Sequence, residues 1–240
     1  LATWVLKRCE YTSVFFPDRA IVVSKALREH FWQKYGVTVT YIPNGTVLPH
    51  VRRAEKITEM GIVPGSYVLF VGRLVPEKGC HYLLDAFRQI DTDAELIVAG
   101  GTSFSTEYVD SLHEMGGDRV RFLGYVYGDV LDELYSNARI FVLPSDLEGL
   151  PIALLEAMSF GNCCLTSDIP ENLEVVGDCG ATFRRGDVPD LVKRLRQLLE
   201  HPDRCRAMGE RARRHVLETY DWDGVALHTE AIYYTMLRGF

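Results

Sequence analysis

The sequence lacks the short motifs that mark several common classes of enzyme and binding protein. The 240 residues contain no G-x-G-x-x-G fingerprint, which argues against a nicotinamide-dependent dehydrogenase, and no G-x-x-x-x-G-K-[ST] phosphate loop. There is no G-x-S-x-G nucleophile elbow. The seven histidines include no metal-binding spacing such as H-E-x-x-H, so no metal site is predicted. No apolar run approaches the ~20 residues of a membrane-spanning helix.

Paired cysteines and an excess of positive charge are missing too. None of the six cysteines forms a C-x-x-C pair, which argues against a zinc ribbon or a thioredoxin-type site. Cys163 and Cys164 are adjacent within an apolar run and resemble small buried residues of a protein in a reducing compartment, so we expect a cytoplasmic location. The net charge is −7, from 26 basic and 33 acidic residues, so nucleic acid is not predicted as a partner. A local basic patch for an anionic ligand stays open.

Short apolar runs alternate with helix-like segments along most of the chain. Runs such as YVLFVG and ELIVAG are apolar without alternation, which is typical of strands buried on both faces of a parallel sheet. Strands are predicted at 20–24, 39–42, 67–72, 95–100, 119–124, 139–144 and 163–167. Helices are predicted at 24–34, 79–89, 105–115, 128–137, 151–159, 188–199, 210–220 and 221–237. The alternation predicts an α/β protein with a doubly wound, Rossmann-like parallel sheet, in which ligands bind at the carboxyl ends of the strands.

The chain divides into four predicted parts. Residues 1–42 hold a helix, a strand and a second helix, and are expected to be the end of a domain whose first part is absent. Residues 43–66 are rich in turn residues and are predicted to connect two units. Residues 67–220 form the predicted Rossmann-like domain, and residues 221–240 form a terminal helix capped by Asp221. An apolar stripe on this helix is expected to dock onto the core: Trp222, Val225, Thr229, Ile232, Tyr233 and Met236.

Two glutamates bracket a predicted helix start in the stretch EGLPIALLEAMSFG, residues 148–161. We expect Pro151 at the first helical position, Glu148 in the preceding loop and Glu156 in the second turn. The amides near Gly149 and Leu150 lie at the helix N-terminus, which favours anions such as phosphate. A diphosphate flanked by two polyols, that is a nucleotide-sugar, fits this arrangement. Alternatively, Glu148 caps the helix and Glu156 lies on a solvated face.

Two cations follow the predicted strand at 67–72, in the stretch VGRLVPEKG. Arg73 and Lys78 lie in the loop at the carboxyl end of this strand, where both can converge on a diphosphate. Gly72 and Gly79 permit close approach of the backbone. The alternative is that both cations are ordinary surface charges.

The stretches VGRLVPEKG, LPSDLEGLPIALLEAMSFG and YIPNG together resemble the retaining family-4 glycosyltransferases of GT-B fold, the glycosyl transferases group 1. The resemblance begins before FPDRAIVVS and covers nearly the whole chain. Glu148 and Glu156 match the E-x7-E signature of that family, and Arg73 and Lys78 match its G-R-x-x-x-x-K signature.

The resemblance implies a role for each matching residue. Arg73 and Lys78 hold the donor diphosphate and stabilise the leaving nucleotide. Glu148 contacts the donor sugar, and Glu156 accepts hydrogen bonds from the ribose. The amides of Gly149 and Leu150, with Gly72, lie against the sugar and phosphates, while Tyr125 and Val126 meet the base. The catalytic set is thus Glu148, Arg73 and Lys78, without a metal. The only cofactor-like ligand is the donor substrate, a UDP-sugar or GDP-sugar.

The resemblance also implies how the rest of the protein is organised. The chain corresponds to the C-terminal, donor-binding half of a hexosyltransferase, and the missing N-terminal domain binds a glycan or glycolipid acceptor. Two functional alternatives stay open: a half that needs the missing domain for transfer, and a stand-alone nucleotide-sugar-binding module without catalysis. The resemblance allows peripheral association with the cytoplasmic face of a membrane. Aromatic residues near both ends of the chain are expected to lack their packing partners and to favour a dimer: Trp4, Phe15, Phe16, Phe31, Trp32, Tyr233 and Tyr234.

Overall fold

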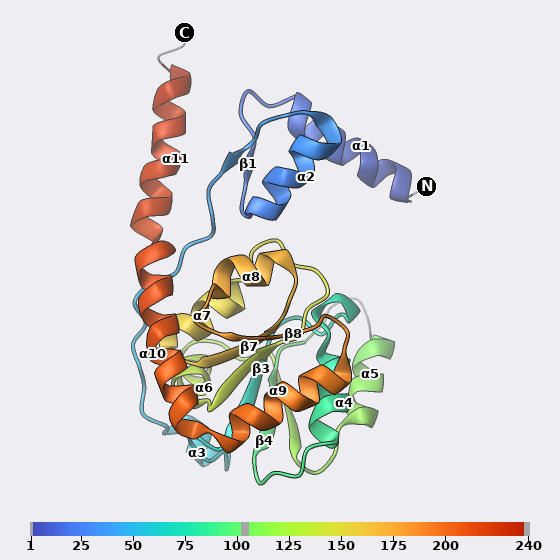
Figure 1. Cartoon of the computed structure of the whole chain (residues 1–240), viewed down its shortest axis with the longest axis vertical. Helices are drawn as coiled ribbons and strands as arrows, with labels where there is room; N and C mark the ends of the chain where they lie inside the picture. Colours follow the sequence, from blue (N-terminus) through green and yellow to red (C-terminus); the bar gives the residue numbers. More distant parts are fainter. Residues whose placement is uncertain (1, 102–105, 238–240) are drawn as a thin grey trace.

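The computed structural model describes residues 2–101 and 106–237, which form a six-stranded parallel sheet covered by helices and a smaller N-terminal unit (Figure 1). The strand order is β5-β4-β3-β6-β7-β8. The strands are β3 (Tyr67–Val71), β4 (Glu95–Ala99), β5 (Val120–Gly124), β6 (Ile140–Leu143), β7 (Cys163–Ser167) and β8 (Ala181–Phe183). The order reverses between β3 and β6, so the predicted doubly wound sheet is confirmed.

Helices bury both faces of the sheet because neighbouring residues of each strand point in opposite directions. Val68 and Phe70 of β3 lie in one core, with side chains of α4 (Cys80–Arg88), α5 (Thr106–Met115) and α9 (Val188–Glu200). Tyr67 and Leu69 lie in the other, with α6 (Asp129–Asn137), α7 (Ile152–Phe160) and α10 (Pro202–Thr219). The unbroken apolar runs in the sequence follow from this double burial.

A small βαβ unit precedes the sheet. It consists of α1 (Ala2–Phe15), β1 (Ile21–Val22), α2 (Lys25–Tyr35) and β2 (Thr40–Tyr41), and its two strands are parallel. Its own core is small, built around Val14, Val22 and Val39. The unit touches the main domain through α8 (Pro170–Val176), where the Lys25 amide donates to the Glu174 carboxylate over 2.8 Å.

The connection between the two units is tied to the main domain along its length. It contains the short helix α3 (Lys56–Glu59), and Ile57 and Ile62 are buried in the core. The buried carboxylate of Glu133 on α6 accepts from the amides of Glu55 and Ile57, at 3.0 and 3.1 Å. The connection is therefore packed and ordered, although its sequence indicates mainly turns.

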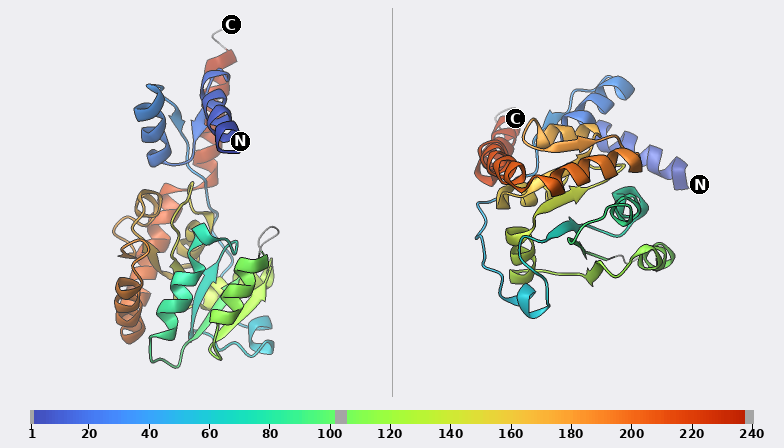
Figure 2. Two further views of the ribbon diagram at one scale, coloured as in Figure 1. Left: turned by 90° about the vertical axis from the view of Figure 1, so that its right-hand side faces the viewer. Right: turned by 60° about the horizontal axis from the view of Figure 1, so that its bottom comes forward.

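The terminal helix α11 (Trp222–Leu237) extends past the sheet in the same direction as the N-terminal unit (Figures 1 and 2). The Asp221 cap is confirmed, because its carboxylate accepts from the amides of Asp223 and Gly224 at 2.8 and 3.0 Å. The expected docking of the apolar stripe is only partial. Val225, Ile232 and Met236 are half-buried, and no side chain of α11 is fully buried. No described helix is both long enough and apolar enough to cross a bilayer.

Candidate functional site

The two charged motifs lie in adjacent loops at one edge of the sheet. The loop after β3 carries Arg73 and the short 3-10 helix η1 (Pro76–Lys78), and the loop after β6 carries Glu148 and leads into α7. Strands β3 and β6 are hydrogen-bonded neighbours, so their carboxyl ends lie next to one another. This pairing brings together residues that are 70 positions apart in the chain.

Lys78 and Glu148 form a nearly buried ion pair. The Lys78 ammonium donates to both carboxylate oxygens of Glu148, at 2.7 and 2.6 Å, and the two side chains are 18% and 5% exposed. The Ser145 hydroxyl donates to the same carboxylate over 2.7 Å. Glu148 therefore does not cap α7, and Lys78 is not an ordinary surface charge. Because an ammonium has three N–H donors, one remains for a ligand.

Gly79 lets the two loops approach each other. Its φ is +68°, and an added Cβ would lie 2.1 Å from the carbonyl oxygen of Pro144. A side chain at this position would be strained and would push the Lys78 loop away from the Glu148 loop. The glycine is thus required by both the backbone conformation and the contact.

Hydrogen bonds between buried polar side chains connect the Glu148 loop to β7 and α8. The Asn172 amide on α8 donates to the Ser167 hydroxyl over 3.0 Å, and the Ser167 hydroxyl donates to the carbonyl of Ser145. Ser145 in turn donates to Glu148. Asn172, Ser167 and Ser145 have no solvent exposure. These hydrogen bonds fix the position of the loop relative to β7.

Helix α7 begins one residue later than predicted. Pro151 is its N-cap, with extended backbone, and Ile152 is the first helical residue. Among the described residues, the amides of Gly149 and Leu150 have no backbone hydrogen-bond partner, and Gly149 is exposed. The Leu150 side chain is buried in the core, so only its backbone is available to a ligand.

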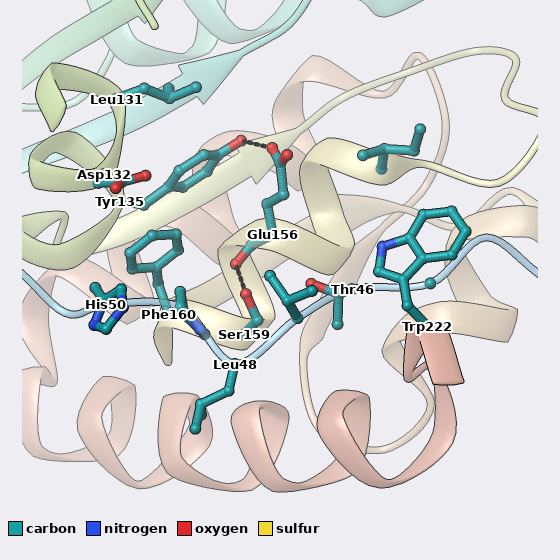
Figure 3. Close-up of a pocket in the computed structure, with 14 residues that line it drawn as sticks. Thr46, Leu48, His50, Leu131, Asp132, Tyr135, Glu156, Ser159, Phe160 and Trp222 are labelled. Carbon is teal, nitrogen blue, oxygen red and sulfur yellow. Dashed lines mark hydrogen bonds between the residues drawn. The ribbon is translucent and has the colours of Figure 1, made fainter. Parts of the chain in front are cut away.

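Glu156 lies in a pocket of about 410 Å³ between α6, α7, the connection near Thr46 and the start of α11 (Figure 3). Its carboxylate accepts a 3.0 Å hydrogen bond from the hydroxyl of the buried Tyr135. Burial raises the pKa of Glu156, and the hydrogen bond from Tyr135 partly offsets this effect. The alternative of a solvated glutamate does not fit this environment.

A second, smaller pocket of about 230 Å³ brings the remaining predicted residues together. Gly72, Arg73, Tyr125 and Val126 line it, at the carboxyl ends of β3, β4 and β5. Leu131 of α6 lines both this pocket and the Glu156 pocket. The two pockets are therefore neighbours that share the wall residue Leu131.

The predicted residues thus form two groups at the same edge of the sheet. The first group consists of Lys78, Glu148, Gly149 and Leu150. The second group lines the two pockets and includes Arg73 and Glu156. Sequence reasoning missed the partners of the two glutamates, Tyr135 and Ser145, and it missed Asn172, which supports the Glu148 loop through Ser167. Ser145 lies three residues before Glu148, a local signal that could have been used, whereas Tyr135 and Asn172 are brought in only by the packing of α6 and α8.

Comparison with known proteins agrees with this arrangement. The profile of the family described as "Glycosyl transferases group 1" matches residues 55–215, which include both charged motifs. The chain belongs to this family. An uncharacterized glycosyltransferase of Methanocaldococcus jannaschii is 30% identical over 93% of this chain and 62% of its own length. The N-acetyl-alpha-D-glucosaminyl L-malate synthase of Bacillus anthracis is 36% identical over 75% of this chain and 48% of its own length.

Solved structures of glycosyltransferases share the fold. Sucrose-phosphate synthase from Thermosynechococcus elongatus is 26% identical with a TM-score of 0.81, covering 93% of this chain and 59% of that protein. HepE from Anabaena, solved with UDP and glucose, is 21% identical with a TM-score of 0.85, covering 97% of this chain and 66% of that protein. The GT-B-like fold prediction is confirmed. This chain spans less than two thirds of the length of the first two curated relatives of its family, at 62% and 37%.

Proposed function

We propose that this chain is the donor-binding half of a retaining hexosyltransferase, which moves a sugar from UDP or GDP to a glycan or glycolipid. The observation that carries the proposal is the Lys78–Glu148 pair at the carboxyl edge of the sheet, beside the start of α7. The family match supports the transferase class. HepE, which has this fold, has been solved with UDP and with UDP-glucose, and this supports a nucleotide-sugar donor.

The proposed transfer needs positive charge near the leaving group. The bond between the sugar C1 and the diphosphate oxygen breaks, so negative charge grows on the diphosphate. C1 forms a bond to the oxygen of an acceptor hydroxyl, whose O–H bond breaks and whose proton passes to the leaving diphosphate. Arg73 offers a forked guanidinium, and Lys78 offers the N–H that Glu148 does not use. These two cations can stabilise the leaving nucleotide without a metal.

Glu148 has two tasks in this proposal. Its carboxylate holds Lys78 in place, and the one lone-pair site that Lys78 and Ser145 leave, on Oε2, is the acceptor for a donor-sugar hydroxyl. The free amides of Gly149 and Leu150 face the phosphates, and Glu156 accepts from the ribose. Because this chain spans 62% and 37% of the first two curated relatives, we propose that transfer needs a longer protein that also binds the acceptor.

The test is a transfer assay on the longer protein that contains this chain. We expect sugar transfer from one UDP- or GDP-hexose, undiminished by a chelator, with the anomeric configuration of the donor kept in the product. Glu148→Gln should abolish most of the transfer in this assay, whereas Glu218→Gln, an exposed glutamate of α10, should not. Inversion at C1, or a strict need for a divalent cation, would contradict the mechanism. A stand-alone binding module would bind the nucleotide but transfer no sugar.

A further inference from the structure

A pocket of about 220 Å³ lies at the free edge of the sheet, away from the proposed donor site. It is lined by the first residues of the edge strand β8, by α9 and by α10. The donor site is at the carboxyl ends of the strands, whereas Gly180 and Ala181 mark the amino end of β8. The two sites are therefore distinct: one follows the carboxyl ends of the central strands, and the other lies beside the edge strand β8.

Two arginines from different helices line this pocket. Arg194 comes from α9 and Arg204 from the first turn of α10, and both are exposed. Arg194 has one carboxylate near it, Asp190 at 3.5 Å, and Asp190 is also bound to the amide of Arg184. The described residues give Arg204 no ion-pair partner within 4.0 Å. The charges of Arg194 and Arg204 are thus largely available to a ligand.

The surroundings of the pocket are basic in a chain that is acidic overall. The lining helices α9 and α10 together contain eight Lys and Arg and five Asp and Glu, a charge of +3, while the whole chain carries −7. Gln197 and Thr182 add neutral donors to the wall. A cluster of this sign attracts anions even where single contacts are weak.

The backbone of β8 adds another donor. The carbonyl of Phe183 accepts from the Asp168 amide and therefore faces β7. Because successive residues of a strand turn their backbone groups to opposite sides, the N–H of Thr182 faces away from β7, towards the open edge. Thr182, which lines the pocket, thus adds a hydroxyl and a backbone amide to the donors near the two guanidinium groups.

We propose that this pocket binds a phosphate group, held by Arg194 and Arg204. Guanidinium groups pair with phosphate oxygens in a forked geometry, and the remaining oxygens are matched by Thr182 and Gln197. The phosphate can belong to a free small anion or to a phospholipid headgroup, because both present the same tetrahedral oxygens. This site is independent of the proposed donor site and of its chemistry.

The test uses pyrophosphate as the probe and calorimetric titration of the whole 240-residue chain. All variants carry Arg73→Gln, which weakens binding at the proposed donor site. We expect saturable binding that becomes at least tenfold weaker on Arg194→Gln or Arg204→Gln. Arg211→Gln is the matched control, since Arg211 lies on the same face of α10 two turns further, about 10 Å along the axis. This control should change the affinity less than twofold.

A second arm identifies the source of the phosphate. Vesicles of phosphatidylcholine with one third phosphatidylglycerol are compared with pure phosphatidylcholine in a flotation assay. Arg204-dependent binding to the anionic vesicles alone assigns the site to a headgroup, and binding of pyrophosphate alone assigns it to a small anion. The proposal is wrong if neither probe binds, if the vesicles bind without regard to charge, or if Arg211→Gln weakens binding as much as Arg204→Gln.

Discussion

Glu156 is a partly buried carboxylate, and none of the described Lys, Arg or His residues forms an ion pair with it within 4.0 Å. Its neighbour is the Tyr135 hydroxyl, and burial raises its pKa above the ordinary value of 4.5. The folded chain therefore binds this proton more tightly than the unfolded chain does. Ionised Glu156 costs stability, and this cost is present once the pH rises through the folded-state pKa. The proposed ribose contact would give this destabilising carboxylate a function.

We predict that Glu156→Gln makes the unligated chain more stable at pH 7 and a poorer nucleotide binder. The gain in the free energy of unfolding should shrink as the pH falls through the raised folded-state pKa towards 4.5, and should be small below 4.5, where the wild-type carboxylate is mostly protonated in both states. Nucleotide affinity should fall by about 1–3 kcal/mol, or about 5- to 150-fold, the scale of a hydrogen bond to a charged group.

Denaturation curves at pH 7 and pH 4, together with calorimetric titration, measure both effects. Glu218→Gln on the exposed part of α10 serves as the control. An unchanged nucleotide affinity in Glu156→Gln would remove the ribose assignment, whatever the stability does.

Lys78 and Glu148 are expected to depend on each other. Each shields a charge that would otherwise lie in a poorly solvated loop, since their side chains are 18% and 5% exposed. Lys78→Met and Glu148→Gln should each destabilise the chain, and the double variant should cost about 1–3 kcal/mol less than the sum. Urea denaturation of the four chains gives this coupling energy. Additive effects would mean that the pair contributes nothing measurable.

At the scale of helices and strands, the sequence predicted most of the elements that a local pattern of apolar residues determines. The strands at 67–72, 95–100, 119–124, 139–144 and 163–167 are confirmed within two residues, because double burial leaves unbroken apolar runs. The helix expected at 105–115 is described from Thr106 on, and residue 105 lies outside the described residues. Strand β8 and helix α8 were not predicted, since three and seven residues are too short for a clear period.

The candidate site was predictable only in part, because some of its contacts join elements that are distant in the sequence or too short to be predicted. Arg73, Lys78, Glu148 and Glu156 stand in short motifs that can be read directly. The fact that Lys78 meets Glu148 follows from the pairing of β3 with β6, which spacing alone does not reveal. Likewise, Asn172 supports the Glu148 loop through α8, an element that the sequence did not indicate.

Gly79 gives the element-scale prediction. Gly79 and Gly65 both have positive φ, +68° and +72°, but an added Cβ meets the Pro144 carbonyl only at Gly79. Gly65→Ala should cost about 1–2 kcal/mol for its left-handed backbone. Gly79→Ala should cost at least about 2 kcal/mol more, because the two site loops must move apart. Thermal denaturation of both variants compares them directly, and equal losses would show that the loops are not closely packed.

At the scale of the whole molecule, large apolar side chains are exposed on the N-terminal unit and on α11. Trp4, Phe16 and Tyr233 are 61%, 80% and 64% exposed. Of the seven aromatic residues that the sequence indicated, six are exposed, and Phe31 is half-buried against the small N-terminal core. Surfaces of this kind are usually covered by another chain or domain.

We predict that the 240-residue chain associates with itself in a concentration-dependent way. Sedimentation velocity should show a dimer or larger species that weakens in the double variant Trp4→Ser and Phe16→Ser. The control is Tyr127→Ser, which changes an exposed aromatic residue of the main domain and should leave the association unchanged. A monomer at all concentrations would contradict this prediction and would show that these exposed aromatic side chains do not drive association.

The central claim is that this chain alone holds the nucleotide of a sugar donor, through Arg73, Lys78 and Glu156. The most direct measurement is calorimetric titration of the chain with UDP, GDP, ADP and NAD, without added metal. We predict micromolar binding of UDP or GDP, which Arg73→Ala abolishes, and no binding of NAD. If a folded sample binds none of the diphosphates, or binds one equally well in Arg73→Ala, the assignment of this edge of the sheet as a donor site is contradicted.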